Sequence, residues 1–108
     1  MNEFKIKISK DFSLTPKGRS HPQDGKYTGE LFRTEFLEPI FNKYDKIIID
    51  LDGLYGCPSS FREEAFGGLA RVFGSNTVLS KLEFIAKDRP PLIDLIIMDI
   101  KKANDKNV

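Results

Sequence analysis

The feature that most constrains the fold is an apolar run near the middle of the chain. Residues 46–52 read Lys-Ile-Ile-Ile-Asp-Leu-Asp, with three consecutive β-branched side chains. Such a run is typical of a parallel strand that helices cover on both faces, because a half-exposed strand alternates apolar with polar residues. We therefore expect these residues to form the central strand of an α/β sheet.

Two further segments, residues 3–9 and 81–85, alternate apolar with polar side chains and predict strands with one buried face. Between the predicted strands, apolar side chains recur at helical spacing. They predict one amphipathic helix over residues 28–44 and a second over residues 59–73, which Gly74 ends. The first helix contains Pro39, so we expect a kink there, because proline cannot donate a backbone hydrogen bond.

The last apolar segment, Leu92 to Ile100, has the composition of a buried strand, but its spacing favours a helix. The preceding residues, 88–91, read Asp-Arg-Pro-Pro, a cap followed by proline that commonly opens helices. This order of elements predicts an α/β layered domain with a mixed, partly parallel sheet of about four strands and about three helices. At 108 residues we expect one domain over 1–108, with a polar tail from about residue 102.

Charge and composition argue against several classes of function. Seventeen basic residues against sixteen acidic ones leave no positive excess for nucleic-acid binding. The apolar runs are too short for a signal peptide or a membrane span, so we expect a cytoplasmic protein that does not bind membranes. One cysteine and one histidine are too few for an ordinary zinc site, and we expect neither a metal nor another cofactor.

The segment after the central run resembles a known family. Residues 50–69 read Asp-Leu-Asp-Gly-Leu-Tyr-Gly-Cys-Pro-Ser-Ser-Phe-Arg-Glu-Glu-Ala-Phe-Gly-Gly-Leu. They are similar to the signature of bacterial and archaeal STAS-like proteins of unknown function, and the similarity extends from Phe12 to about Phe84. That family is distantly similar to the anti-sigma factor antagonists. The resemblance implies a STAS-like layered fold in which a strand, a loop and a serine-bearing helix start follow one another.

In anti-sigma factor antagonists, a partner kinase phosphorylates a serine at this helix start and thereby controls binding. By resemblance, Ser59 or Ser60 occupies that position here. The antagonists carry an acidic residue, two serines and a glycine, whereas this chain has Pro58 before the serines and Phe61 after them. The resemblance thus implies a protein partner, of the histidine-kinase-like ATPase or switch-protein type, and a candidate phospho-acceptor at the helix start.

Ser60 also has a structural interpretation. Ser60 and Glu63 have the spacing of a capping box, in which the hydroxyl accepts a backbone amide and the carboxylate reaches back. A cap and a regulatory or anion-binding role are compatible, because a helix start presents free amides. The leading hypothesis is a non-enzymatic regulatory module that binds a protein. Its candidate contact residues are Tyr55, Phe61, Arg62, Glu63 and Glu64.

The end of the central run supports a second hypothesis. Asp50 and Asp52 point to the same side of a strand and lie where open α/β sheets commonly bind ligands. Together with Arg19, from a long loop, they form a candidate site for a nucleotide or another phosphate compound. The structural alternative is that both carboxylates accept hydrogen bonds from loop amides and from Arg19 or Arg33.

No group of residues predicts catalysis. Ser60, His21 and an aspartate lack the glycine-flanked turn of a serine nucleophile, and we expect Cys57 to be packed in the interior. We therefore expect no enzyme. Surface shape separates the two remaining hypotheses: exposed Tyr55 and Phe61 on a flat surface favour protein binding, whereas a deep polar pocket favours a small ligand.

The pair Gly67-Gly68 lies inside the second predicted helix. Two glycines there cost about 2 kcal/mol relative to two alanines, so another interaction has to offset this cost. We expect close packing of this helix against a neighbouring element.

Overall fold

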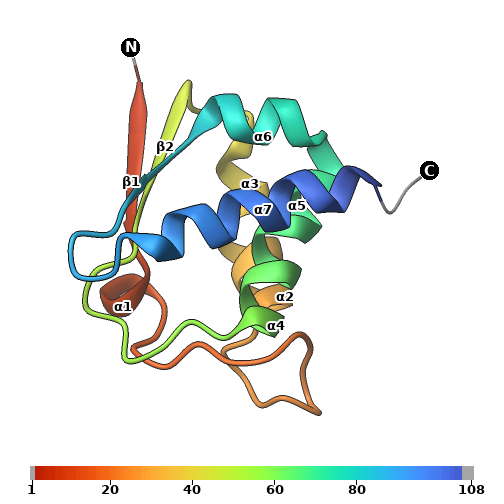
Figure 1. Cartoon of the computed structure of the whole chain (residues 1–108). Helices are drawn as coiled ribbons and strands as arrows, with labels where there is room; N and C mark the ends of the chain where they lie inside the picture. The colour runs from red at the N-terminus through yellow and green to blue at the C-terminus, as the bar shows by residue number, and fades with distance from the viewer. Residues whose placement is uncertain (1, 106–108) are drawn as a thin grey trace.

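A three-stranded parallel sheet lies along one side of the computed structural model, which describes residues 2–105 (Figure 1). The strands lie in the order β1 (Glu3–Lys7), β2 (Lys46–Asp50) and β3 (Leu82–Ile85), so the central strand is the predicted one. The α/β class is confirmed. Within the described residues the sheet has three strands instead of about four, and both pairings are parallel rather than mixed.

Two long helices, each interrupted by one π-helical turn, connect the strands. The first is α2 (Gly29–Phe32), η1 (Arg33–Leu37) and α3 (Glu38–Phe41), and a short α1 (Ile8–Asp11) precedes it. The second is α4 (Ser59–Arg62), η2 (Glu63–Gly67) and α5 (Gly68–Phe73). The remaining helices are α6 (Ser75–Lys81) and α7 (Pro91–Asp105).

The long helices cover one face of the sheet only. The chain moves from β1 to β2 to β3 in one direction, and right-handed crossovers then place both connecting helices on the same face, as Figure 1 shows. Ile47 and Ile49 point into this covered face and are fully buried. On the other face, Ile48 is half-buried between Lys5 and Glu83, which are exposed. The prediction that helices cover both faces of the central strand is therefore wrong.

The first long helix begins where the sequence predicts. The hydroxyl of Thr28 accepts a hydrogen bond from the backbone amide of Leu31, at 3.2 Å. The irregularity expected at Pro39 takes the form of the π-helical turn η1, in which the amide of Glu38 donates to the carbonyl of Arg33. Because the next residue is proline and cannot donate, the wider turn directly precedes it.

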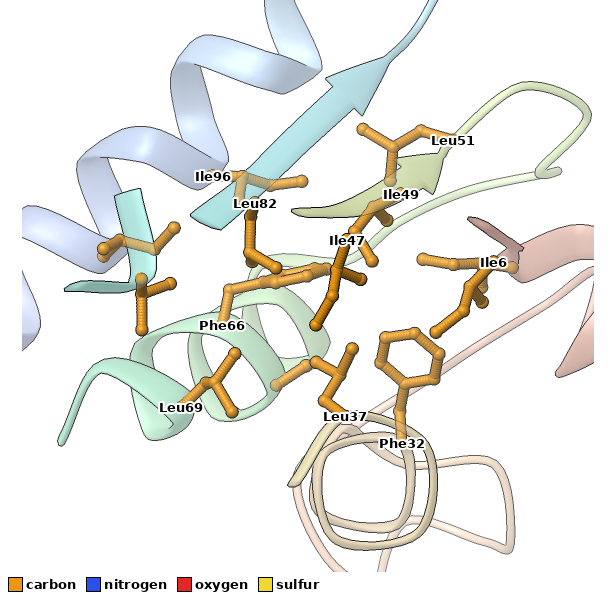
Figure 2. Close-up of a cluster of buried hydrophobic side chains, with 14 of the residues drawn as sticks. Ile6, Phe32, Leu37, Ile47, Ile49, Leu51, Phe66, Leu69, Leu82 and Ile96 are labelled. Atoms are coloured by element: carbon orange, nitrogen blue, oxygen red, sulfur yellow. The ribbon is translucent and has the colours of Figure 1, made fainter. Parts of the chain in front are cut away.

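Phenylalanine side chains are the largest members of the core between the helices and the sheet. The rings of Phe32 and Phe61, one from each long helix, lie 5.9 Å apart between centroids. Phe12 contacts both rings and so anchors the loop that follows α1. Figure 2 shows Phe32 and Phe66 reaching from the helices toward the buried isoleucines of β2. The predicted apolar faces of both long helices therefore form the core.

The C-terminal third differs from the prediction in two places. Gly74 ends the second long helix with a φ of 93°, as expected, but the chain then forms α6, which its polar sequence does not predict. The last apolar segment is a helix that starts at Pro91, and this prediction is confirmed. The expected polar tail is helical as far as Asp105, and Ala103 within it is fully buried.

Close packing explains the glycine pair. A Cβ on Gly68 would lie 2.6 Å from Nε of Arg33, and one on Gly67 would lie 3.4 Å from the carbonyl oxygen of Asp99 in α7. Gly68 therefore lets the first long helix approach the second more closely than a larger residue would allow, whereas a Cβ on Gly67 would come closest, at 2.9 Å, to Oε2 of Glu63 in the same helix. The expectation of close packing is confirmed.

Replacing Gly68 with alanine tests this contact. Alanine has the higher helix propensity, by about 1 kcal/mol, but the clash with a tightly held Arg33 outweighs that gain. We expect Gly68→Ala to lose about 1–2 kcal/mol of unfolding free energy in urea denaturation. The matched control is Gly56→Ala, since nothing lies within 4 Å of a Cβ there, and it should change stability by less than about 0.5 kcal/mol. Equal stability of the two variants would contradict the packing role.

Candidate functional site

Because all three strands are parallel, the segments that follow them gather at one end of the sheet. These segments are residues 8–28, 51–58 and 86–90, and we call them the loop edge. Figure 1 shows them along the left and the bottom of the view, with the start of α4. The candidate residues Arg19, Asp52, Tyr55 and Ser59 belong to the loop edge or directly adjoin it.

The carboxylates at the end of β2 bind loop amides. Asp50 is buried and accepts a hydrogen bond from the amide of Asp52 at 3.0 Å. Asp52 in turn accepts the amide of Asp88 at 3.1 Å, and Asp88 accepts the amide of Gly53 at 3.0 Å. The hydrogen bond from the Asp88 amide holds the pKa of Asp52 below its ordinary value. The loop-amide part of the structural alternative is therefore observed, whereas neither Arg19 nor Arg33 pairs with these two aspartates.

Arg19 does not join these aspartates. Its guanidinium forms an ion pair with Glu63 and lies 3.6 Å from Glu64, both on the second long helix. Glu63 also pairs with Arg71 at 2.7 Å. The hydrogen bond to Glu63 raises the pKa of Arg19. The expected grouping of Arg19 with the two aspartates is thus replaced by a link between the loop edge and η2.

The two candidate serines start α4 without capping it. The helix begins at Ser59, its N-cap residue is Pro58, and no side chain caps it. The capping-box prediction for Ser60 and Glu63 is wrong, because the Glu63 carboxylate turns to arginines instead of back to the helix start. Ser59 is exposed and Ser60 is half-buried, so Ser59 is the more accessible hydroxyl.

Of the expected contact residues, Tyr55 is the most exposed and Phe61 is the most buried. Tyr55 exposes 76% of its surface, whereas Phe61 exposes 0% and lies in the aromatic core. The prediction that Phe61 belongs to a contact surface is therefore wrong. Arg62 lies 3.2 Å from Asp99 of α7, in an ion pair that is mostly buried.

Tyr55 borders a shallow groove that sequence reasoning missed. The groove has a volume of about 280 Å³, opens to solvent and is lined mainly by apolar atoms. It lies between two loop segments that the hydrogen bond from the Tyr55 amide to the Leu14 carbonyl joins, at 3.0 Å. In the sequence, the signals for this region were the candidate contact residue Tyr55 and the long, turn-rich loop after α1. The lining residues are Thr15, Pro16, Lys17, Tyr55, Gly56 and Pro58.

Residues 28–90 match the family described as STAS-like domain of unknown function (DUF4325). The chain belongs to this family. The match starts at the cap of α2 and ends just before α7, so it begins later than the resemblance seen in the sequence and extends further. No curated protein and no solved structure matches the chain.

The STAS-like domain holds its two long helices together through Arg33. In η2 the amide of Gly68 donates to the carbonyl of Glu63, five residues back. The next carbonyl, that of Glu64, accepts instead from Nε of Arg33 at 3.2 Å. The two terminal nitrogens of Arg33 bind the carboxylates of Glu64, at 2.9 Å, and Glu38, at 2.6 Å. One side chain thus satisfies a carbonyl that the π-helical turn leaves available.

Removing Arg33 should cost far more than removing a surface arginine. The Arg33 side chain is only 15% exposed, and its loss leaves two glutamates and one carbonyl without this donor. We expect Arg33→Met to lower the unfolding free energy by about 2–4 kcal/mol. Arg71→Met, which removes a more exposed ion pair, should cost less than about 1 kcal/mol. Similar losses of unfolding free energy for the two variants in urea denaturation would show that Arg33 contributes no more than an exposed arginine.

Asp99 gives the STAS-like domain a pH-dependent contribution to stability. Burial raises the pKa of Asp99, and the ion pair with Arg62 only partly opposes this rise. The folded domain therefore binds this proton more tightly than the unfolded chain does. The stability that results is fully present below the ordinary pKa of aspartate and is lost as the pH rises through the raised pKa of the folded state.

Asp99→Asn removes this titration. We expect the stability of the wild type relative to the variant to decrease as the pH rises through that window, measured by urea denaturation over a pH series. A difference that stays constant, or that increases with pH, would contradict the raised pKa.

Cys57 offers no reactive thiol. The side chain is 8% exposed, and burial raises the pKa of the thiol to about 11, so the thiolate is scarce at neutral pH. Among residues 2–105, no three side chains of the His, Cys, Asp or Glu type are grouped so that they could hold a metal ion. No helix in the same range has the length and apolar character needed to cross a membrane. The cytoplasmic location stays a prediction.

Proposed function

We propose that this STAS-like domain is a non-enzymatic regulatory module that binds another protein through the loop edge and is switched by phosphorylation of Ser59 or Ser60. The observation that carries the proposal is the exposed Tyr55, which lies beside a shallow apolar groove and four residues before the exposed Ser59. An exposed aromatic side chain next to an open apolar surface is typical of protein contacts.

The order of the strands supports a protein partner over a small ligand. Open α/β sheets bind small molecules in a crevice where the strand order reverses direction. Here the order is β1-β2-β3, without a reversal among the described strands. In addition, Asp50 and Asp52 already accept loop amides, and Arg19 lies against the second long helix. Binding of a nucleotide or phosphate compound at the strand end remains the alternative proposal, and it would require these contacts to rearrange.

A phosphate on Ser59 would act directly on the contacts of Arg19. Ser59 and Glu63 are four residues apart, so their side chains share one face of the helix. Glu63 is already paired with Arg19, whose side chain is 48% exposed. A phosphate adds about two negative charges and would compete with Glu63 for that guanidinium. The modification would thereby change the charge beside Tyr55 and loosen the loop that Arg19 ties to η2.

The proposed kinase is a histidine-kinase-like ATPase. The Ser59 hydroxyl oxygen would form a bond to the γ-phosphorus of ATP, the bond to the bridging oxygen would break, and ADP would leave. The hydroxyl proton would pass to a base or to solvent. Ser60 is the second acceptor position, although its half-buried side chain makes it less accessible.

Partner capture and phosphate mapping test the proposal together. Wild type, Ser59→Ala, Ser60→Ala, Ser59→Asp and Ser60→Asp serve as bait in lysate of the native cells, with mass spectrometry of bait and captured proteins. We expect phosphate on Ser59 or Ser60 of the wild type and at least about tenfold less captured partner with the corresponding aspartate variant.

The matched control is Ser80→Asp, which places the same charge on an exposed serine of α6, at the opposite end of the domain from the loop edge (Figure 1). It should capture the partner as the wild type does. If the wild type captures no specific partner and carries no phosphate on either serine, the proposal is wrong.

A further inference from the structure

The acidic side chains of the loop edge are occupied by backbone amides. Asp24 accepts the amides of Arg19 and Ser20, at 3.0 and 3.2 Å. Asp11 accepts the amide of Lys7 at 2.9 Å. As described above, the aspartates that follow β2 and β3 bind loop amides in the same manner. These four carboxylates therefore stabilise the loops, and much of their hydrogen-bonding capacity is used inside the chain.

Most of the basic side chains of the loop edge lack ion-pair partners among residues 2–105. Five exposed lysines and arginines form no ion pair with any residue between 2 and 105 at the 4.0 Å limit for an N···O contact. Arg19 is the exception, since it pairs with Glu63. A partner of negative charge would therefore find cations that have no competing carboxylate in direct contact. The five residues are Lys10, Lys17, Lys26, Lys87 and Arg89.

The groove brings one of these cations next to an apolar surface. Lys17 lines the groove together with Tyr55 and Pro58. A volume of about 280 Å³ is at the lower limit for a small-molecule pocket and is suited to one or two apolar side chains. The groove is also bounded by two loop segments rather than by walls on all sides, which suits an extended chain that passes across it.

We propose that the groove binds an extended acidic segment of the partner protein. This inference rests on the proposed function and adds the chemistry of the partner. An apolar side chain of the segment packs against Tyr55 and Pro58, and its neighbouring carboxylates lie near Lys17, which lines the groove, and extend toward the other loop-edge cations that form no ion pair among residues 2–105. The arrangement also gives the phospho-switch a physical basis, because phosphate on the nearby Ser59 repels an acidic segment.

Selection from a displayed library of random peptides tests this inference without knowledge of the partner. The whole chain is immobilised, and peptides are enriched on the wild type and counter-selected on Tyr55→Ala. We expect enriched peptides to combine acidic residues with at least one large apolar residue. Enrichment of basic or uncharged peptides, or no enrichment beyond that on Tyr55→Ala, would overturn the inference.

The affinity of the most enriched peptide then locates the contact. By fluorescence anisotropy we expect Tyr55→Ala, Lys17→Glu and Ser59→Asp each to weaken binding at least about tenfold, and added salt to weaken binding to the wild type. The matched control is Met98→Ala, an exposed apolar residue of α7 outside the groove, which should bind within about twofold of the wild type. Unchanged binding by Tyr55→Ala and Lys17→Glu would overturn the inference, as would ATP that displaces the peptide more strongly than sodium chloride of equal ionic strength.

The two proposals fail in different ways. If the bait carries phosphate and captures a partner while the library yields basic or uncharged peptides, only the acidic chemistry of the segment is wrong. If the bait shows neither phosphate nor partner while the library yields acidic peptides that require Tyr55, the groove binds such segments but the phospho-switch is wrong.

Discussion

The contact that the rest of the structure depends on is the one between Arg33 and the second long helix. Both long helices leave α geometry where they meet, and the Arg33 side chain lies between their π-helical turns. Gly68 is required there because any side chain would displace the guanidinium. The two helices are thereby held at one distance, and Glu63 of the second helix pairs with Arg19 of the loop edge. An ion-pair network that serves packing thus also positions the candidate site.

The parallel sheet explains why chemistry collects at one end of this domain. With three strands pointing the same way, each strand must be followed by a loop that turns at the same edge. These loops need carboxylates to satisfy their amides, which is the role of Asp24, Asp52 and Asp88. The basic residues are not needed for this purpose and stay available. In the loop edge the aspartates therefore bind backbone amides within the chain, while the lysines and arginines remain at the surface. This follows because loops satisfy their backbone amides with acidic side chains.

Local periodicity was sufficient to predict the strands, both long helices and the helix that starts at Pro91, because each buries one regular apolar face. It failed for α6, where apolar burial is limited chiefly to Val78, and for the open face of the sheet, where Ile48 lies in an apolar run without a helix above it. The site shows the same limit. Tyr55 and Ser59 could be identified from a motif, but the partner of Arg19 lies 44 residues away and depends on tertiary packing.

The π-helical turn η2 has a consequence for the direction in which the helix start faces. A π turn contains one residue more than an α turn. Side chains that precede the turn are therefore rotated about the helix axis by about 100° from where a continuous α-helix would place them. The core contacts of α5 and α7 set the rotation of the C-terminal half, and the extra residue then determines which way Ser59 points. Loss of one residue between positions 63 and 67 would restore a regular helix and rotate the hydroxyl about the helix axis. The direction in which Ser59 faces therefore depends on the number of residues in η2 as well as on which side chains η2 contains.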